Sequence, residues 1–196
     1  LLYNLIRRDG SLFYNHVDRL ADETVIDPAS WIGRSAWQLH QRLIWDQTRT
    51  HVHNTHYCSM ITEWLLWCVP VNWYGWETMD HALANQGNIW RIPVAIYTDK
   101  QKTRLAEWHP AKYHPCPWPL ELAERIILLT TQPGDEVLDP WGGSHIMADA
   151  CQRTRRRYTG IDQSDKYNQL AARRLAAWQP PLFDVFAPAG LPGMEA

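Results

Sequence analysis

The sequence predicts an α/β fold in which helices pack on both faces of a parallel sheet. Residues 119–178 alternate in the order helix, strand, helix, strand, helix, which is typical of parallel sheets. The chain has 196 residues, of which 45% are hydrophobic and 20% charged, so it can bury a core and is not a disordered chain. This length corresponds to one domain with room for a small additional lobe.

The first half of the chain contributes mainly strands. Residues 2–8 are expected to end a helix, and residues 11–15 to form a short apolar strand. Residues 43–45 and 64–69 have the apolar composition of two buried strands, and a polar loop rich in His, Thr and Asn separates them. Residues 21–41 are mixed in character and are expected to be partly helical.

Two segments lack regular patterning. Residues 70–113 contain scattered Gly and Pro with weak periodicity, which predicts an irregular, exposed lobe. Residues 179–196 contain Pro-Pro and Pro-Ala-Gly and are expected to form a flexible tail. The chain is thereby divided at these segments into a first part over residues 1–69 and a regular part over residues 114–178.

The regular part begins with a helix, a turn and a strand. Pro119 suits the first position of a helix, because the missing N–H of proline costs nothing there. The apolar residues that follow form one stripe at helical spacing, namely Leu122, Ala123, Ile126, Ile127 and Leu129. Residues 133–135, Pro-Gly-Asp, predict a turn, and residues 136–139 predict a short strand.

A Gly-rich bend at residues 141–144 connects this strand to a second helix. The apolar face of that helix comprises Ile146, Met147, Ala150 and Cys151. Residues 158–162 predict the next strand, and Ser164 is a suitable N-cap for a third helix. One side of the third helix comprises Tyr167, Leu170, Ala171, Leu175 and Trp178.

Two carboxylates lie where a parallel sheet binds ligands. Ligands of such sheets bind at the carboxyl ends of the strands, beside a Gly-rich turn. Asp139 ends one strand and Asp162 ends the next, at the spacing from which a carboxylate holds the ribose hydroxyls of a nucleoside cofactor. The bend lacks G-x-G-x-x-G and has nothing after it to hold a pyrophosphate, which disfavours NAD and FAD. A plain structural turn is the alternative interpretation.

Three segments together resemble the amino-directed DNA methyltransferases. They are residues 114–119 (His-Pro-Cys-Pro-Trp-Pro), 134–144 (Gly-Asp-Glu-Val-Leu-Asp-Pro-Trp-Gly-Gly-Ser) and 156–162 (Arg-Arg-Tyr-Thr-Gly-Ile-Asp). Members of this family use S-adenosylmethionine to methylate the exocyclic amino group of adenine or cytosine in DNA. The order of the segments is similar to that of the permuted beta branch, in which the catalytic half precedes the cofactor half.

The resemblance implies a Rossmann-like, S-adenosylmethionine-dependent methyltransferase sheet with circularly permuted order. Residues 1–69 would form the catalytic-side half, residues 114–178 the S-adenosylmethionine-binding half, and residues 70–113 a candidate target-recognition region. The cofactor implied is S-adenosyl-L-methionine, and the main partner implied is double-stranded DNA. Paired subunits are common in the family, so a homodimer is a further expectation.

The resemblance also assigns roles in cofactor binding. Asp139 would hold the charged amino-acid end of the cofactor or orient the turn around it, and Trp141 would pack against the cofactor. Gly142 and Gly143 would allow close approach of the backbone, and Ser144 would cap the next helix. The full expected set is Asp139, Pro140, Trp141, Gly142, Gly143, Ser144, His145, Asp162 (on the ribose hydroxyls), and His114 and Pro115 (over the methionine end).

Two departures from the family pattern concern the turn and the catalytic motif. His145 stands where the family has the second Gly of G-S-G. The D/S/N-P-P-Y/F motif, which holds the flipped target base, is absent, and residues 27–30 (Asp-Pro-Ala-Ser) do not replace it. In the family that motif lies shortly before the first residue here. The chain, which begins Leu-Leu without Met, is therefore expected to lack its N-terminus, and catalytic residues stay unassigned.

Composition restricts partners and location. The formal net charge of −2 argues against a uniformly basic DNA coat but allows a local basic cleft. The four cysteines include no C-x-x-C pair, which fits a reducing cytosol. The resemblance implies a cytoplasmic protein of a prokaryotic or phage-like source. His51, His53, His56 and Cys58 do not have the spacing of a standard zinc finger, so no metal is expected. No apolar run reaches the roughly 18 residues of a membrane span.

The sequence therefore predicts a site-specific DNA methyltransferase acting on an exocyclic amine. It does not distinguish adenine from cytosine as the target, because the deciding motif is not in the chain. Two alternatives belong to other classes. One is a catalytically inactive remnant that binds cofactor or DNA, and the other is a methyltransferase that acts on RNA or a small molecule.

Overall fold

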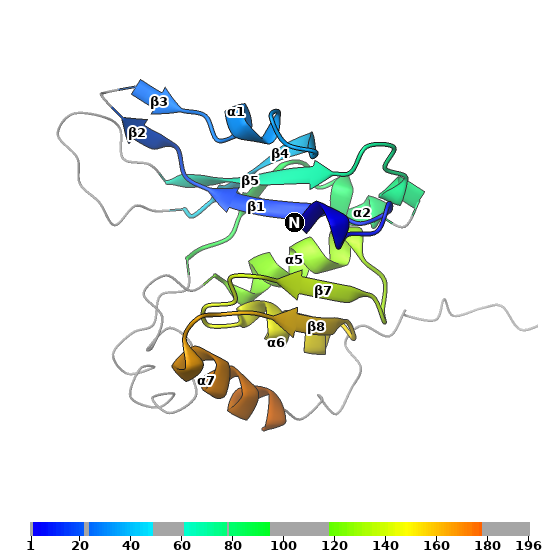
Figure 1. The fold of residues 1–196 in the computed structure, drawn as a ribbon, viewed down its shortest axis with the longest axis vertical. Coiled ribbons are helices and arrows are strands. Elements are labelled where there is room, and N and C mark those ends of the chain that lie inside the picture. The colour runs from blue at the N-terminus through cyan, green and yellow to red at the C-terminus, as the bar shows by residue number, and fades with distance from the viewer. Residues whose placement is uncertain (1, 22–23, 49–60, 78, 95–117, 178–196) are drawn as a thin grey trace, which may run out of the picture.

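The largest unit of the fold is a mixed four-stranded sheet. The computed structural model describes residues 2–21, 24–48, 61–77, 79–94 and 118–177. The sheet has the order β1-β5-β4-β6 (Figure 1). Its strands are β1 (Leu12–His16), β4 (Gln38–Asp46), β5 (Thr62–Val69) and β6 (Ile89–Arg91). Strand β5 is antiparallel to both β1 and β4, whereas β6 is parallel to β4.

A second, parallel pair of strands follows later in the chain. It consists of β7 (Glu136–Asp139) and β8 (Arg157–Gly160), with Asp139 opposite Gly160 in the register. Helix α6 (Ile146–Arg153) connects the two strands, and helix α7 (Asp165–Ala176) follows β8. The four-stranded sheet thus precedes this strand–helix–strand unit in the chain, as the permuted order predicts.

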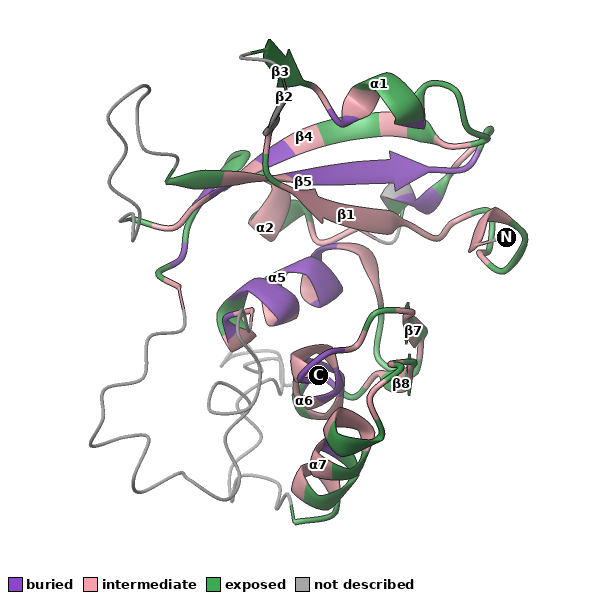
Figure 2. Ribbon diagram, turned by 60° about the vertical axis from the view of Figure 1, so that its left-hand side comes forward, coloured by how far each residue is buried: buried purple, intermediate pink, exposed green. Residues whose placement is uncertain are grey.

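Helix α5 (Leu120–Thr130) lies between the four-stranded sheet and helix α6 (Figure 2). One side of α5 joins the core of the sheet through Leu122, Ile126 and Leu129, which pack in one cluster with residues such as Trp45. Its other side carries Ala123 and Ile127, which form a second cluster with Ala150 and Cys151 of α6. A single helix therefore contributes to both cores, and it joins the two halves of the fold.

The opposite face of the four-stranded sheet is covered by a short helix. Helix α1 (Ala29–Ile32) places Ile32 against Leu66 and Cys68 of β5. Helices consequently lie on both faces of this sheet, which is mixed and not parallel throughout as the alternation of elements predicts. One face of the β7–β8 pair is covered by other residues that the structure describes. Leu138 lies on the opposite face and is exposed.

The first half agrees with the sequence in one segment and differs in another. Residues 21–41, which are expected to be mixed and partly helical, contain α1, and β3 (Thr24–Ile26) pairs with β2 (Arg19–Ala21) in an antiparallel hairpin near their start. The N-terminal segment contains the 3-10 turn η1 (Leu2–Asn4) in place of the predicted helix end. This turn is three residues long, too short for a periodic pattern to identify it.

The expectation that residues 70–113 form an exposed lobe is wrong for their middle part. Strand β6 pairs with β4, and Trp90 and Ile92 are only 2% and 1% exposed within the core of the sheet. The 3-10 turn η2 (Gly75–Glu77) and helix α2 (His81–Ala84) precede β6. A strand of three residues is specified by its tertiary neighbours rather than by its own pattern. Residues 95–113 and 179–196 lie outside the described residues.

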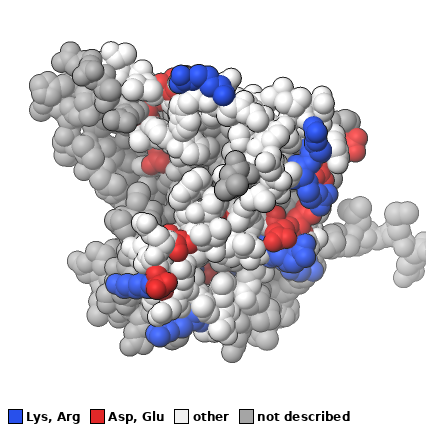
Figure 3. All heavy atoms as spheres, viewed as in Figure 1, with Lys and Arg blue, Asp and Glu red and all other residues white. Residues whose placement is uncertain are grey.

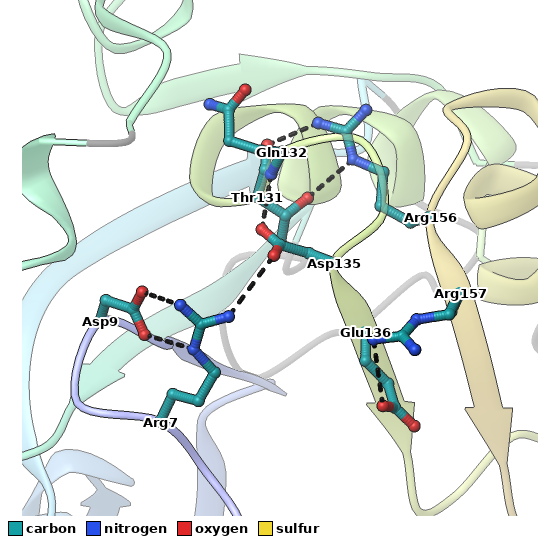
Figure 4. Close-up of polar contacts among 8 residues, drawn as sticks. All are labelled: Arg7, Asp9, Thr131, Gln132, Asp135, Glu136, Arg156 and Arg157. Atoms are coloured by element: carbon teal, nitrogen blue, oxygen red, sulfur yellow. Dashed lines mark hydrogen bonds and ion pairs between the residues drawn. The ribbon is translucent and has the colours of Figure 1, made fainter.

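Polar contacts connect the N-terminal segment to the start of β7 (Figure 4). The Arg7 guanidinium donates to both carboxylate oxygens of Asp9, and it lies 3.7 Å from a carboxylate oxygen of Asp135. Arg156 donates to the Thr131 hydroxyl at 3.0 Å and so holds the end of α5 close to β8. On the face drawn in Figure 3, basic groups lie beside acidic ones, which agrees with such pairing.

Candidate functional site

The Gly-rich turn lies at the carboxyl edge of the β7–β8 pair. Asp139 is the last residue of β7, and Asp162 comes two residues after the end of β8. Because the two strands are parallel, both carboxylates lie at the same edge. The backbone N–H of Gly143 donates to Oδ2 of Asp162 at 2.8 Å. The structure therefore brings together the turn and the second carboxylate, as the sequence predicts.

Two backbone amides fix the orientation of the Asp162 carboxylate. Besides the bond from Gly143, its Oδ1 accepts a hydrogen bond of 2.8 Å from the backbone N–H of Ser164. Ser164 is the N-cap of α7, and its hydroxyl accepts from the N–H of Tyr167, as expected. A carboxylate can accept about four hydrogen bonds, so this arrangement is compatible with further donors from a ligand.

The Asp139 carboxylate lies deeper in the turn. Its Oδ1 accepts a hydrogen bond of 3.2 Å from the backbone N–H of Trp141. Burial raises the pKa of Asp139, and the negative charge of Asp162 acts in the same direction. The Trp141 amide, His145 and Tyr158 act in the opposite direction. The hydrogen bond from Trp141 is compatible with a role of Asp139 in orienting the turn, and both roles expected for this residue stay predictions.

The residue that caps helix α6 is His145, and the prediction that Ser144 caps it is wrong. His145 adopts the left-handed conformation with φ 54°, and α6 begins at Ile146 without a side-chain cap. Ser144 is buried, and its carbonyl accepts a hydrogen bond of 2.9 Å from Arg174. The helix starts one residue later than predicted, because residue 145 adopts the left-handed conformation and cannot belong to the helix. Histidine is more frequent than most residues in that conformation.

The His145 side chain fills the space beneath the turn. It is only 4% exposed, with Nδ1 at 2.8 Å from the Tyr158 hydroxyl and Nε2 at 2.9 Å from Oδ1 of Asn168. A Cβ atom at Gly142 would collide with the His145 ring, and one at Gly160 would collide with the Tyr158 hydroxyl. The absence of a side chain at Gly142 therefore leaves room for the His145 ring.

One aromatic side chain of the turn is open to solvent. The Trp141 side chain is 71% exposed at the tip of the turn, where a ligand can pack against it. Outside the turn, the indole N–H of Trp118 donates to Oδ1 of Asn15 at 3.1 Å and ties the segment before α5 to β1. His114 and Pro115 lie outside the described residues.

Sequence reasoning missed Tyr158 and Asn168 as residues of this region. Tyr158 lies on a short strand, where an aromatic residue is expected for packing alone, and Asn168 lies on a helix rich in polar residues. The one available signal was the histidine in place of glycine at position 145, because a buried imidazole requires hydrogen-bond partners.

No cluster of three or more His, Cys, Asp or Glu with metal-binding geometry occurs among the residues that the structure describes. The segment with His51, His53, His56 and Cys58 lies outside those residues. Within the described part of the chain, every helix is too short or too polar to span a bilayer.

Comparison with known proteins agrees with this geometry. A family model described as DNA methylase matches residues 1–173. The chain belongs to this DNA methylase family. The type II methyltransferase M2.DpnII of Streptococcus pneumoniae is 28% identical over 145 residues, which are 74% of this chain and 53% of that protein. The chain spans about half the length of the curated relatives that it matches.

Solved structures of DNA methylases share the fold. The cytosine-N4-specific PvuII DNA methyltransferase superposes with a TM-score of 0.69 at 18% identity, covering 86% of this chain and 64% of that one. The M1.HpyAVI–SAM complex superposes with a TM-score of 0.55 at 25% identity, covering 75% and 67% of the two chains. The predicted membership in the amino-directed methyltransferases and the predicted α/β fold class are confirmed.

Proposed function

We propose that the whole protein transfers a methyl group from S-adenosylmethionine to the exocyclic amine of adenine or cytosine in double-stranded DNA. This chain would supply the cofactor-binding site. The observation that carries the proposal is the hydrogen bond from Gly143 to Asp162, which places two carboxylates around one Gly-rich turn in a member of the DNA methylase family. In addition, one of the similar solved structures, M1.HpyAVI at 25% identity, is a complex with SAM.

The hydrogen bonding of the turn favours a cofactor without phosphate groups. The backbone N–H groups of Trp141, Gly142, Gly143 and His145 all donate to acceptors within the protein. A pyrophosphate needs several such groups directed at the ligand, so these amides do not suit NAD or FAD. A nucleoside with a positively charged amino-acid end matches acidic side chains and an exposed indole better.

Three side chains would hold the cofactor. Asp162, fixed by two backbone amides, would accept hydrogen bonds from the ribose hydroxyls. Asp139 would face positive charge, which offsets the cost of ionising a carboxyl whose pKa burial raises. Trp141, exposed at the tip of the turn, would pack on the cofactor and exclude water from it. His114 and Pro115 remain expected to close over the methionine end.

The chemistry of the reaction divides between cofactor and protein. S-adenosylmethionine supplies a methyl group that its sulfonium already activates. The protein has to hold the cofactor and the flipped base in line, which is mainly a matter of positioning. The P-P-Y-type motif that would hold the target amine is not among the 196 residues, so catalysis is proposed for the whole protein. Residues 70–113 stay the candidate target-recognition region.

A calorimetric titration of this chain with S-adenosylmethionine tests the cofactor site. Saturable binding is expected, and Asp162→Ala should lose it. Asp165→Ala, which removes an exposed carboxylate from the first turn of α7, is the matched control and should bind like the unchanged chain. If circular dichroism shows that the chain is folded and it still does not bind, the proposal is contradicted. Equal binding by Asp162→Ala would also contradict it.

The nucleic-acid substrate needs a separate assay on the whole protein. Methyl transfer from labelled S-adenosylmethionine to duplex DNA is expected in this assay. The expected location of the protein is the cytoplasm, in a prokaryotic or phage-like setting. Label found only in RNA, or in neither nucleic acid, would favour the alternatives of an RNA methyltransferase or an inactive remnant. Sedimentation of the same preparation tests the expected homodimer.

A further inference from the structure

One side chain of helix α7 contacts both the Gly-rich turn and the residue that carries the second carboxylate. The Asn168 amide nitrogen donates to the backbone carbonyl of Asp162 at 3.0 Å, and the Asn168 amide oxygen lies 2.9 Å from Nε2 of His145. Asn168 lies near the start of α7, four residues after the Ser164 cap. A single amide group therefore bridges the turn after β7 and the carboxylate residue after β8.

The two neighbours of the Asn168 amide determine its direction. A backbone carbonyl can only accept a hydrogen bond, so the amide nitrogen faces Asp162 and the amide oxygen faces His145. Turning the amide over would set two oxygens against each other at Asp162. Nε2 of His145 therefore carries the hydrogen of the second bond, while Nδ1 lies 2.8 Å from the Tyr158 hydroxyl. Both nitrogens of this buried ring consequently have a partner.

Helix α7 holds the turn at a second point as well. Arg174 donates to the backbone carbonyls of Ser144 and His145 at 2.9 and 3.1 Å. Its Nε lies 2.8 Å from Oδ2 of Asp149 on α6, and α7 packs beside α6 (Figure 2). Because α7 is fixed against the turn in this way, the bond from Asn168 connects Asp162 to a firm support.

Asp162 is thereby held at three of its atoms. Its two carboxylate oxygens accept from the backbone amides of Gly143 and Ser164, and its carbonyl oxygen accepts from Asn168. The first two bonds orient the carboxylate, whereas the third restricts the backbone from which the carboxylate extends. A polar group that is fixed before a ligand arrives loses less conformational entropy when the ligand binds.

We propose that Asn168, held by His145, is a positioning residue that sets the place of the Asp162 carboxylate for the two ribose hydroxyls of the cofactor. This proposal rests on the proposed function. It also gives a role to the histidine at position 145, because the imidazole supplies a hydrogen-bond donor to Asn168 that a glycine side chain lacks. Asn168 acts through Asp162, so its replacement should weaken only the interactions that the ribose hydroxyls make.

The test compares two nucleosides that differ only in those hydroxyls. Calorimetry measures the binding of adenosine and of 2′,3′-dideoxyadenosine, and the ratio of the two dissociation constants gives the preference for adenosine. Asn168→Ala should lower this preference about fivefold, the size of one ordinary hydrogen bond, and should bind dideoxyadenosine like the unchanged chain. Gln169→Ala, which removes an exposed amide from the same helix, is the matched control and should keep the preference.

Two further variants separate positioning from support of the fold. Asn168→Asp keeps the size of the side chain and an acceptor for His145 but removes the donor to Asp162, so it should lose the preference as Asn168→Ala does. His145→Gly should also lower the preference, and Asn168→Ala should then add little to the effect. Weaker binding of both nucleosides by the same factor would indicate a merely structural role and would overturn the proposal.

A measurement without ligand gives an independent readout. The NMR shift of the Gly143 amide proton, which bonds to Asp162, should change in both Asn168 variants and stay constant in Gln169→Ala. An unchanged shift in the Asn168 variants would overturn the proposal. A preference for adenosine that survives in both Asn168 variants overturns this proposal alone. If the unchanged chain binds neither S-adenosylmethionine nor adenosine, the proposed function is contradicted, and this proposal falls with it.

Discussion

The backbone N–H of Gly143 and the carboxylate of Asp162 are joined by a hydrogen bond of 2.8 Å across 19 residues of sequence. Through this bond, the side chain proposed to bind the ribose is also a structural part of the turn after β7. The same carboxylate accepts from Ser164 at the start of α7. Stability and cofactor binding are therefore expected to respond together to any change at Asp162.

Replacing Asp162 should lower stability as well as affinity. In Asp162→Ala, the partly buried amides of Gly143 and Ser164 lose their acceptor, which should cost about 1–3 kcal/mol in the free energy of unfolding. Urea denaturation followed by circular dichroism measures this loss. Asp165→Ala, on the exposed start of α7, should stay within about 0.5 kcal/mol of the unchanged chain. Equal stability of all three chains would show that these hydrogen bonds are not formed in solution.

Gly142 and His145 should show strong energetic coupling. Gly142→Ala places a methyl group against the His145 ring, and overpacking of this kind costs about 1–3 kcal/mol. His145→Gly removes the ring and keeps a residue that tolerates the positive φ. Adding Gly142→Ala to His145→Gly should therefore cost much less than adding it to the unchanged chain. A double-mutant cycle of unfolding free energies measures the coupling, and strictly additive effects would contradict the close packing.

Asp139→Asn should make the protein relatively more stable as pH rises. The folded state holds the carboxyl proton of Asp139 more tightly than the unfolded state, because burial raises its pKa. Ionisation of Asp139 therefore destabilises the fold as pH rises past the ordinary pKa of a carboxyl group. The stability difference between Asp139→Asn and the unchanged chain should grow from acid to neutral pH. A difference that shrinks over that range, in thermal unfolding from about pH 3 to 8, would contradict this reasoning.

The same substitution should weaken binding of S-adenosylmethionine, because an amide does not attract a positively charged group as a carboxylate does. Higher stability together with lower affinity is the combination expected of a binding residue that is held at a cost to the fold. Calorimetry on the chain used for the unfolding measurements checks this. Tighter binding by Asp139→Asn would remove Asp139 from the proposed site.

Ile127 should be essential to the core between α5 and α6. Its side chain is 1% exposed, and Ile127→Ala should cost about 2–5 kcal/mol, as buried aliphatic truncations do. Leu5 is 65% exposed, so Leu5→Ala is the matched control and should change stability by about 0.5 kcal/mol or less. Thermal or urea unfolding of the two variants checks the contrast. Equal effects would mean that the side of α5 that faces α6 is not buried as described.

Much of the second half of the fold could be predicted from local signals. Helix α7 begins after the Ser164 cap, because serine favours this position for hydrogen-bonding reasons. Helix α5 begins at Leu120, so Pro119 is its N-cap and marks its start to within one residue of the predicted first position. The two short strands and their common edge followed from the alternation of elements. Asp139 and Asp162 could be placed near one another because parallel strands end at the same edge.

The rest depended on contacts between distant segments. Strand β6 has three residues and exists because it pairs with β4 and buries Trp90. The identity of the α6 cap depended on the backbone conformation of His145, which its sequence neighbours do not determine. The histidine seemed, from the sequence, only a departure from a glycine pattern. Its partners Tyr158 and Asn168 lie 13 and 23 residues further along the chain, beyond the reach of any local rule.

Helix α5 is shared by two cores, and this arrangement affects how the chain can unfold. Leu122 and Ile126 belong to the core of the four-stranded sheet, whereas Ala123 and Ile127 belong to the core with α6. When either core opens, α5 loses the contacts on one of its sides. The helix that remains then supports the other core less well. We therefore expect amide hydrogens in β4 and β7 to exchange with solvent in one cooperative event, so that the sheet and the cofactor half behave as one thermodynamic unit.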